Sequence, residues 1–121
     1  MKLNWFEYID FNEGNVKKYI PQKAGVYKIS AVLINSDKLR VDYIGQAKDL
    51  EERSYQHLSN NEENFSLKEA LNKYHYKISF AEVGYQDDRN TIERALYENY
   101  KPKFNDPKCI PNVEPVNINF N

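Results

Sequence analysis

The chain has a single cysteine, few glycines and no long apolar run, and each scarcity excludes a class of protein. Cys109 alone cannot form an internal disulfide, which favours a reducing compartment and leads us to expect a cytoplasmic protein. The four glycines are not clustered, and there is no Cys/His metal spacing or serine nucleophile turn. These absences exclude nucleotide hydrolases, zinc modules and serine hydrolases. No segment predicts a signal peptide or a membrane span, so we expect no membrane partner.

The charge is nearly balanced, with 17 basic and 18 acidic residues and a formal net charge of −1. Nucleic-acid-binding domains are more often basic, so the overall charge does not favour DNA binding. If DNA is the partner, positive charge must be concentrated locally or supplied by a metal or another chain. The local set that we expect is Lys28, Lys48, Arg53 and Lys101.

The pattern of apolar residues predicts an α/β domain of the α+β type, with a small three-stranded antiparallel sheet flanked by helices. Residues 27–33 and 39–44 alternate around a turn signal at 35–38, which predicts a hairpin. A third strand is predicted at 76–83. Helices are expected from about Leu50 to Leu58 after the capping residue Asp49, from Ser66 through Tyr74, and from Arg89 to Tyr100 after Asp87 or Asp88.

Residues 1–121 are expected to form a single domain, as the length suggests. We divide it into an N-terminal extension at 1–20, a core at about 21–105 that carries the motifs, and a tail at 106–121 that is rich in proline and asparagine. The apolar residues of the extension are expected to pack onto the domain, and the tail is expected to be extended.

The hairpin and the helix after it carry the first candidate site residues. Tyr27 and Tyr43 should be near neighbours on the hairpin, and Gly45 after the second strand would allow a ligand or backbone to approach closely. Arg53 and His57 lie four residues apart and project from one helix face. Arginine suits a phosphate, and histidine exchanges a proton near neutral pH. The alternatives are ordinary strand tyrosines and a solvated helix face.

Glu93 borders the apolar stripe of the last predicted helix. Its carboxylate either reaches solvent or faces a site. A hard cation such as Mg²⁺ takes one or two carboxylates and keeps several waters, so one glutamate suffices for such a site. Glu98 lies elsewhere around the helix and is interpreted as a surface residue.

These residues together resemble the GIY-YIG nuclease family over about Pro21 to Asn105. Gly25-Val26-Tyr27 and Tyr43-Ile44-Gly45 match the two tripeptides, and Arg53, His57, Glu93 and Asn105 follow in the family's order. The resemblance implies metal-dependent hydrolysis of DNA phosphodiester bonds. It implies that Tyr27, Tyr43, Arg53 and His57 are catalytic, that Glu93 binds Mg²⁺ or Mn²⁺, and that Gly25, Gly45, Lys48 and Asn105 support the substrate.

Two observations qualify what the resemblance implies. Gln46 stands where repair-type members of that family often carry a lysine. Family members are usually attached to a DNA-binding domain, so a homodimer or a separate DNA-binding chain is a possible partner here. The alternative function is an inactive GIY-YIG-fold module that binds nucleic acid or protein, and RNA is an alternative substrate. Which tyrosine is the base stays open.

Overall fold

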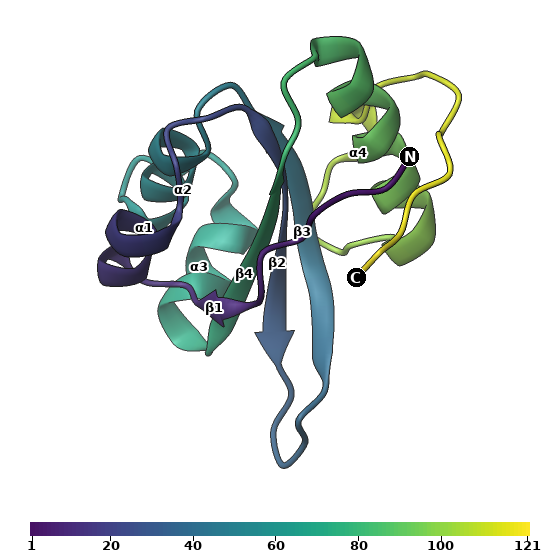
Figure 1. Cartoon of the computed structure of the whole chain (residues 1–121). Coiled ribbons are helices and arrows are strands. Elements are labelled where there is room, and N and C mark those ends of the chain that lie inside the picture. Colours follow the sequence, from purple (N-terminus) through teal and green to yellow (C-terminus); the bar gives the residue numbers. More distant parts are fainter.

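The structure is a computed structural model that describes all 121 residues. A four-stranded antiparallel sheet with the order β1-β4-β2-β3 lies between helices on its two faces (Figure 1). The elements in chain order are β1 Ile9–Asp10, α1 Glu13–Tyr19, β2 Gly25–Val32, β3 Leu39–Ala47, α2 Leu50–Leu58, α3 Phe65–Lys73, β4 Tyr76–Glu82, α4 Gln86–Tyr100 and the 3₁₀ helix η1 Pro107–Cys109.

The expected α+β architecture is confirmed, but the number of strands is wrong. The fourth strand, β1, pairs Ile9 with Ile78 and Asp10 with Lys77 at the edge of β4. Two residues are too few for an alternation of apolar and polar side chains to be recognised.

Three helix starts also differ from those expected from the sequence. Helix α1 was not predicted, because residues 12–15 look like a break, yet the side chain of Asn12 caps it by accepting a hydrogen bond from the Asn15 amide. Asn64, rather than Ser66, caps α3. Helix α4 begins at Gln86, and its N-cap residue Tyr85 provides no side-chain cap.

Each face of the sheet has its own apolar core, as alternation along a strand requires. Tyr27, Ile29 and Phe80 face the first core, which α1, α2 and α3 cover. Val26 and Ile44 face the second core, which α4 and the two ends of the chain cover. The sheet therefore separates α4 from α1, α2 and α3.

The two ends of the chain run side by side over the second face (Figure 1). The Asn119 side chain accepts a hydrogen bond from the Leu3 amide at 2.6 Å and donates one to the Leu3 carbonyl at 3.0 Å. The Trp5 indole donates to the Asn119 carbonyl at 3.0 Å. The extension thus packs onto the domain as expected, and the tail is held against it.

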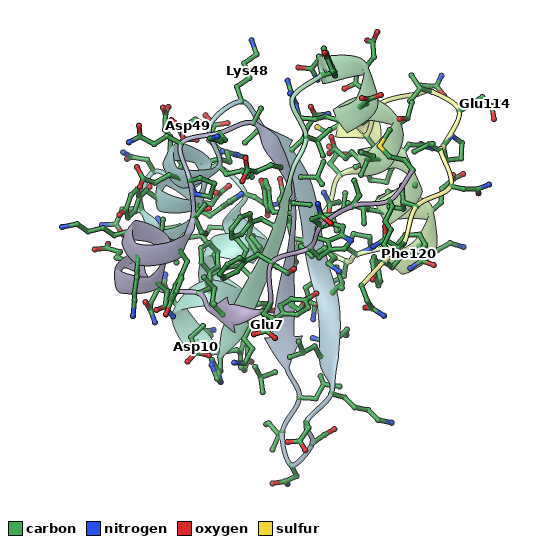
Figure 2. All side chains as sticks on the ribbon, in the orientation of Figure 1. Glu7, Asp10, Lys48, Asp49, Glu114 and Phe120 are labelled. Carbon is green, nitrogen blue, oxygen red and sulfur yellow. The ribbon has the colours of Figure 1, made fainter.

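Lys28 lies beneath these two segments and is 2% exposed. Its Nζ is 4.1 Å from the ring centroid of Trp5 and donates a hydrogen bond of 2.5 Å to the carbonyl of Phe120, which Figure 2 labels beside α4. The expectation that Lys28 takes part in DNA binding is therefore wrong, because neither its charge nor its side chain reaches the surface.

Candidate active site

A cleft of about 810 Å³ opens at the free edge of the sheet, where β3 has no neighbouring strand. Side chains from both faces of the sheet reach it. It is lined by Tyr27, Tyr43, Gly45, Gln46, Arg53, Glu62, Glu63, Asn64, Glu93, Phe104, Asn105, Asp106, Cys109, Ile110 and Pro111. Six of the nine site residues expected from the sequence line this cleft, together with residues of a loop and of the tail.

The two tyrosines are neighbours, as the hairpin predicts. Tyr27 pairs with Gly45 across the β2–β3 ladder, and its ring centroid is 6.3 Å from that of Tyr43 on the same face. A Cβ atom on Gly45 would lie 2.6 Å from Cζ of Tyr27 and closer still to its hydroxyl oxygen. Gly45 is therefore required for the position of the Tyr27 phenol, which adds a packing role to the access expected from the sequence.

Arg53 and His57 project from α2, whose first turn is fixed by the Asp49 side chain accepting the Glu52 amide at 3.0 Å. Arg53 is partly exposed and lines the cleft, where Nη1 donates to Gln56 at 3.0 Å. His57 is 1% exposed and lies behind Tyr27. Its Nε2 is 2.7 Å from the Tyr27 hydroxyl, so His57 contacts a tyrosine rather than the open cleft.

The surroundings keep both phenols protonated. Burial raises the pKa of Tyr27 well above its usual value, and Tyr43 raises it further, while the nearby Arg53 acts in the opposite direction. Burial likewise raises the pKa of Tyr43, again against Arg53. A tyrosine of this site can therefore take a proton from water only if it passes its own proton to another group.

Glu62 was not recognised from the sequence, although it contacts His57. Its Oε2 is 2.5 Å from Nδ1 of His57, and its Oε1 accepts the Asn64 amide at 3.0 Å. The residue is 9% exposed in the short loop between α2 and α3. In the sequence it stands in a polar stretch with no periodicity, and its only signal is a carboxylate five residues after a candidate histidine.

Glu93 reaches the cleft from α4, which packs on the other face of the sheet from α2. Its Oε1 accepts a hydrogen bond of 2.7 Å from Gln46, which is itself held by a 2.8 Å bond to Asn90. Because β3 is the edge strand, Glu93 and Arg53 line one cleft in spite of their opposite origins. The convergence expected of a phosphate site is present for these residues.

The environment of Glu93 fits a single hard cation. Burial raises the pKa of its carboxyl group, opposed by the hydrogen bond from Gln46, and no lysine or arginine pairs with it. Its Oε2 accepts no hydrogen bond from the protein. No group of three His, Cys, Asp or Glu side chains could hold a metal. A cation here would thus rely on one carboxylate and waters, which is a habit of Mg²⁺.

Three expected supporting residues have different roles in the structure. Asn105 lines the cleft, but its side chain bonds the amide and the carbonyl of Ile44 at 2.9 and 2.8 Å, so it fastens the tail to the free edge of β3. A Cβ on Gly25 would lie 2.7 Å from Leu50 Cδ1, which makes Gly25 a packing residue outside the cleft. Lys48 projects into solvent (Figure 2) and does not line the cleft.

A family model for the GIY-YIG catalytic domain matches residues 23–105 of the chain. The chain belongs to the GIY-YIG family. This assignment confirms the resemblance that the two tripeptides and the residues after them indicate.

Relatives of the GIY-YIG domain include UvrABC system protein C from Bacteroides thetaiotaomicron, which is 29% identical over 98 residues. That match covers 78% of this chain and 15% of the relative's length. The N-terminal endonuclease domain of UvrC from Thermotoga maritima, in a structure with magnesium, is 22% identical and has a TM-score of 0.58. The match covers 76% of this chain and 97% of that one.

A Tyr-to-Phe variant of the same UvrC domain, bound to its catalytic divalent cation, also has a TM-score of 0.58 and an identity of 22%. These structures share the fold of the GIY-YIG domain described here. Whether Gln46, in place of a lysine, separates this chain from the repair-type members stays a prediction, because identities of 22–29% do not assign a branch of the family. No helix of the domain has the length and apolar character needed to cross a membrane.

Proposed function

We propose that this GIY-YIG domain is a metal-dependent endonuclease that hydrolyses phosphodiester bonds of DNA. The observation that carries the proposal is the meeting of Tyr27, Arg53 and Glu93 in one cleft at the edge of the sheet. Such a hydrolysis needs a phenol in contact with a histidine, a guanidinium for the phosphate and a carboxylate that is free to bind a metal ion. Family membership supports the same reaction class.

Arg53 is assigned to the phosphate. Its guanidinium is partly exposed in the cleft and stays charged, and its planar set of donors fits phosphate oxygens. The charge that develops on phosphorus oxygens during attack would be stabilised where Arg53 points, beside the phenols of Tyr27 and Tyr43.

Glu93 is assigned to Mg²⁺, with Mn²⁺ as an alternative of similar ligand preference. Gln46 holds one carboxylate oxygen and leaves the other free to bind. When bound, the cation would neutralise charge on the phosphate and its leaving oxygen. The same UvrC structures that share this fold carry a divalent cation, magnesium in one of them.

Tyr27 is the tyrosine assigned to the attacking water. Its hydroxyl is the one bonded to His57, whereas Tyr43 only packs edge-on against the imidazole ring at 5.2 Å between centroids. A water in the cleft can donate a proton to the Tyr27 oxygen while the Tyr27 proton moves to His57. Tyr43 is assigned to shaping the pocket and to a contact with Arg53.

The charge of the cleft predicts weak binding by the isolated domain. Four carboxylate residues line it, namely Glu62, Glu63, Glu93 and Asp106, against one arginine. DNA affinity should therefore be weak and sensitive to salt, and a second copy or a DNA-binding chain would raise it. RNA stays an alternative substrate, and an inactive binding module is the alternative function that the acidic lining favours.

Plasmid nicking by variants of two glutamates on the same helix tests the proposal. Glu93→Ala should abolish nicking in Mg²⁺, because the carboxylate assigned to the cation is lost. Glu98→Ala is the matched control, since Glu98 is exposed and forms only a 3.8 Å pair with Arg94. Circular dichroism of both variants checks the fold. Nicking by Glu93→Ala at the rate of the control would remove the assignment.

A further inference from the structure

Three side chains lie in series behind the cleft. The Tyr27 hydroxyl is 2.7 Å from Nε2 of His57, and Nδ1 of the same ring is 2.5 Å from Oε2 of Glu62. The three residues are 2%, 1% and 9% exposed, so the series is shielded from bulk water. Tyr27 and Glu62, the two ends of the series, line the cleft, whereas His57 between them does not.

The carboxylate decides which ring nitrogen of His57 carries the proton. Burial lowers the pKa of His57, against the influence of Glu62, so the ring is neutral and has one N–H. Burial alone would raise the pKa of Glu62, but hydrogen bonds from His57 and the Asn64 amide hold it below its usual value. An ionised carboxylate only accepts, so Nδ1 donates to Glu62 and Nε2 accepts the Tyr27 hydroxyl.

We propose that Glu62 is a positioning residue of the nuclease, which holds His57 in the tautomer that accepts the proton of Tyr27. This inference rests on the proposed function. It places the proton acceptor at Nε2 of His57 and makes Tyr27 the relay between water and histidine. The effect of Glu62 on the reaction passes through its contact with His57.

The proton and electron balance of the step is simple. A water oxygen forms its bond to phosphorus with a lone pair while one water proton passes to the Tyr27 oxygen. The Tyr27 proton passes to Nε2 of His57, and the resulting imidazolium keeps its Nδ1 proton in the bond to Glu62. The bond from phosphorus to the leaving oxygen breaks with its electron pair on that oxygen, which takes a proton from solvent.

The loop that carries Glu62 is held in place by Asn64. Asn64 donates its backbone amide to Glu62, caps α3 by accepting the Leu67 amide at 3.1 Å, and donates from Nδ2 to the Phe104 carbonyl at 2.7 Å. A carboxylate held on such a support keeps its distance from His57 without the cost of ordering a free chain.

Among the groups that face His57, Glu62 alone can balance a positive charge on the imidazole ring. Tyr27 from β2 and Tyr43 from β3 contact the ring and are neutral, while Arg53 on the same helix disfavours an imidazolium. Glu62 is the one anion in direct contact with His57. Without it, an imidazolium formed during the reaction would be buried beside a guanidinium with no counterion.

The substitution Glu62→Gln, with Glu69→Gln as control, tests the inference. Glutamine keeps the shape of Glu62 but removes the charge, and its amide can donate to Nδ1 and reverse the tautomer. Glu69 lies on the exposed face of α3 and pairs only with Lys73 at 3.2 Å. Single-turnover nicking in Mg²⁺ from pH 5 to pH 9 and ¹⁵N shifts of His57 are measured for both variants and the parent.

The parent should show the Nδ1–H form, and Glu62→Gln should lose that form and about 10²-fold or more of the nicking rate. The acid limb of its rate profile should move to lower pH, because the His57 pKa falls when the carboxylate charge is lost. Glu69→Gln should match the parent in all three readouts.

Each other result overturns the inference in a distinguishable way. Full nicking and an unchanged pH profile for Glu62→Gln would remove the positioning role and leave the nuclease standing. A lower rate with an unchanged tautomer and profile would show that Glu62 only supports the loop. A parent that never nicks DNA in Mg²⁺ would remove the proposed function, and the role of Glu62 with it.

Discussion

Replacing Gly45 with alanine adds only one methyl group, but it should disturb both the stability and the active site of the domain. The added Cβ would lie 2.6 Å from Cζ and 3.1 Å from Cε1 of Tyr27, well inside contact distance. The ring cannot easily move, because Tyr27 is 2% exposed and its hydroxyl is bonded to His57. Either the ring leaves His57 or β3 shifts away from β2.

The loss of stability depends on which of these two movements occurs. Overpacking a well-packed core typically costs about 1–3 kcal/mol. Loss of the bond to Tyr27 would leave a buried nitrogen of His57 unpaired, at about 1–3 kcal/mol. Either movement therefore costs about 1–3 kcal/mol, which corresponds to a fall in Tm of roughly 4–12 °C for a domain of this size. Displacement of the phenol by about 1 Å should lower the nicking rate about 10²-fold.

Thermal unfolding and single-turnover nicking of Gly45→Ala and Gly84→Ala measure both effects. Gly84 is the control, because a Cβ there meets nothing within 4 Å and its φ is not positive. Gly84→Ala should keep the parent's rate and gain up to about 1 kcal/mol from a stiffer unfolded chain. A Gly45→Ala variant with the parent's Tm and rate would refute the packing argument.

Two further predictions concern charged residues. Arg53→Lys should lower the single-turnover nicking rate about 10²–10³-fold with an unchanged circular dichroism spectrum, because lysine keeps the charge but not the planar donors; a rate near the parent's would contradict the phosphate assignment. Burial lowers the pKa of Lys28 to about 8, so the unfolded chain binds more protons above that pH and the free energy of unfolding should rise by about 2 kcal/mol between pH 7.5 and 9.5. Urea unfolding of the parent and of Lys28→Met at both pH values measures this rise, which the variant should lack. An equal change in the free energy of unfolding for parent and variant would disprove the prediction.

The parts of the fold that follow from short-range patterns could be predicted from the sequence. The β2–β3 hairpin has alternating strands around a polar turn, and α2 has Asp49 as its cap. Strand β1 and helix α1 could not be found, because a two-residue strand has no period and the Asn12 cap resembles a loop. Their formation depends on the β4 edge and on the core that they cover.

The site was predictable where a residue type and its spacing carry the chemistry. Tyr27, Arg53 and Glu93 meet in the cleft. Glu62 was not identified from the sequence because its role depends on the path of a loop, and the path of a loop leaves no periodic pattern in the sequence. Lys28 was misassigned although alternation places it opposite Tyr27, because only the docking of both chain ends reveals that this face is covered.

Nicking of supercoiled plasmid under single-turnover conditions, by the parent and by Tyr27→Phe, in Mg²⁺ and in chelator, tests the central claim most directly. The parent should nick in Mg²⁺ and stop in chelator, since Glu93 offers a free carboxylate oxygen for the cation and Arg53 a guanidinium for the phosphate. Tyr27→Phe removes the only hydroxyl bonded to His57 and should lose about 10²-fold or more of the rate. A parent that fails to nick, nicking that persists in chelator, or a Tyr27→Phe variant as fast as the parent would contradict the account.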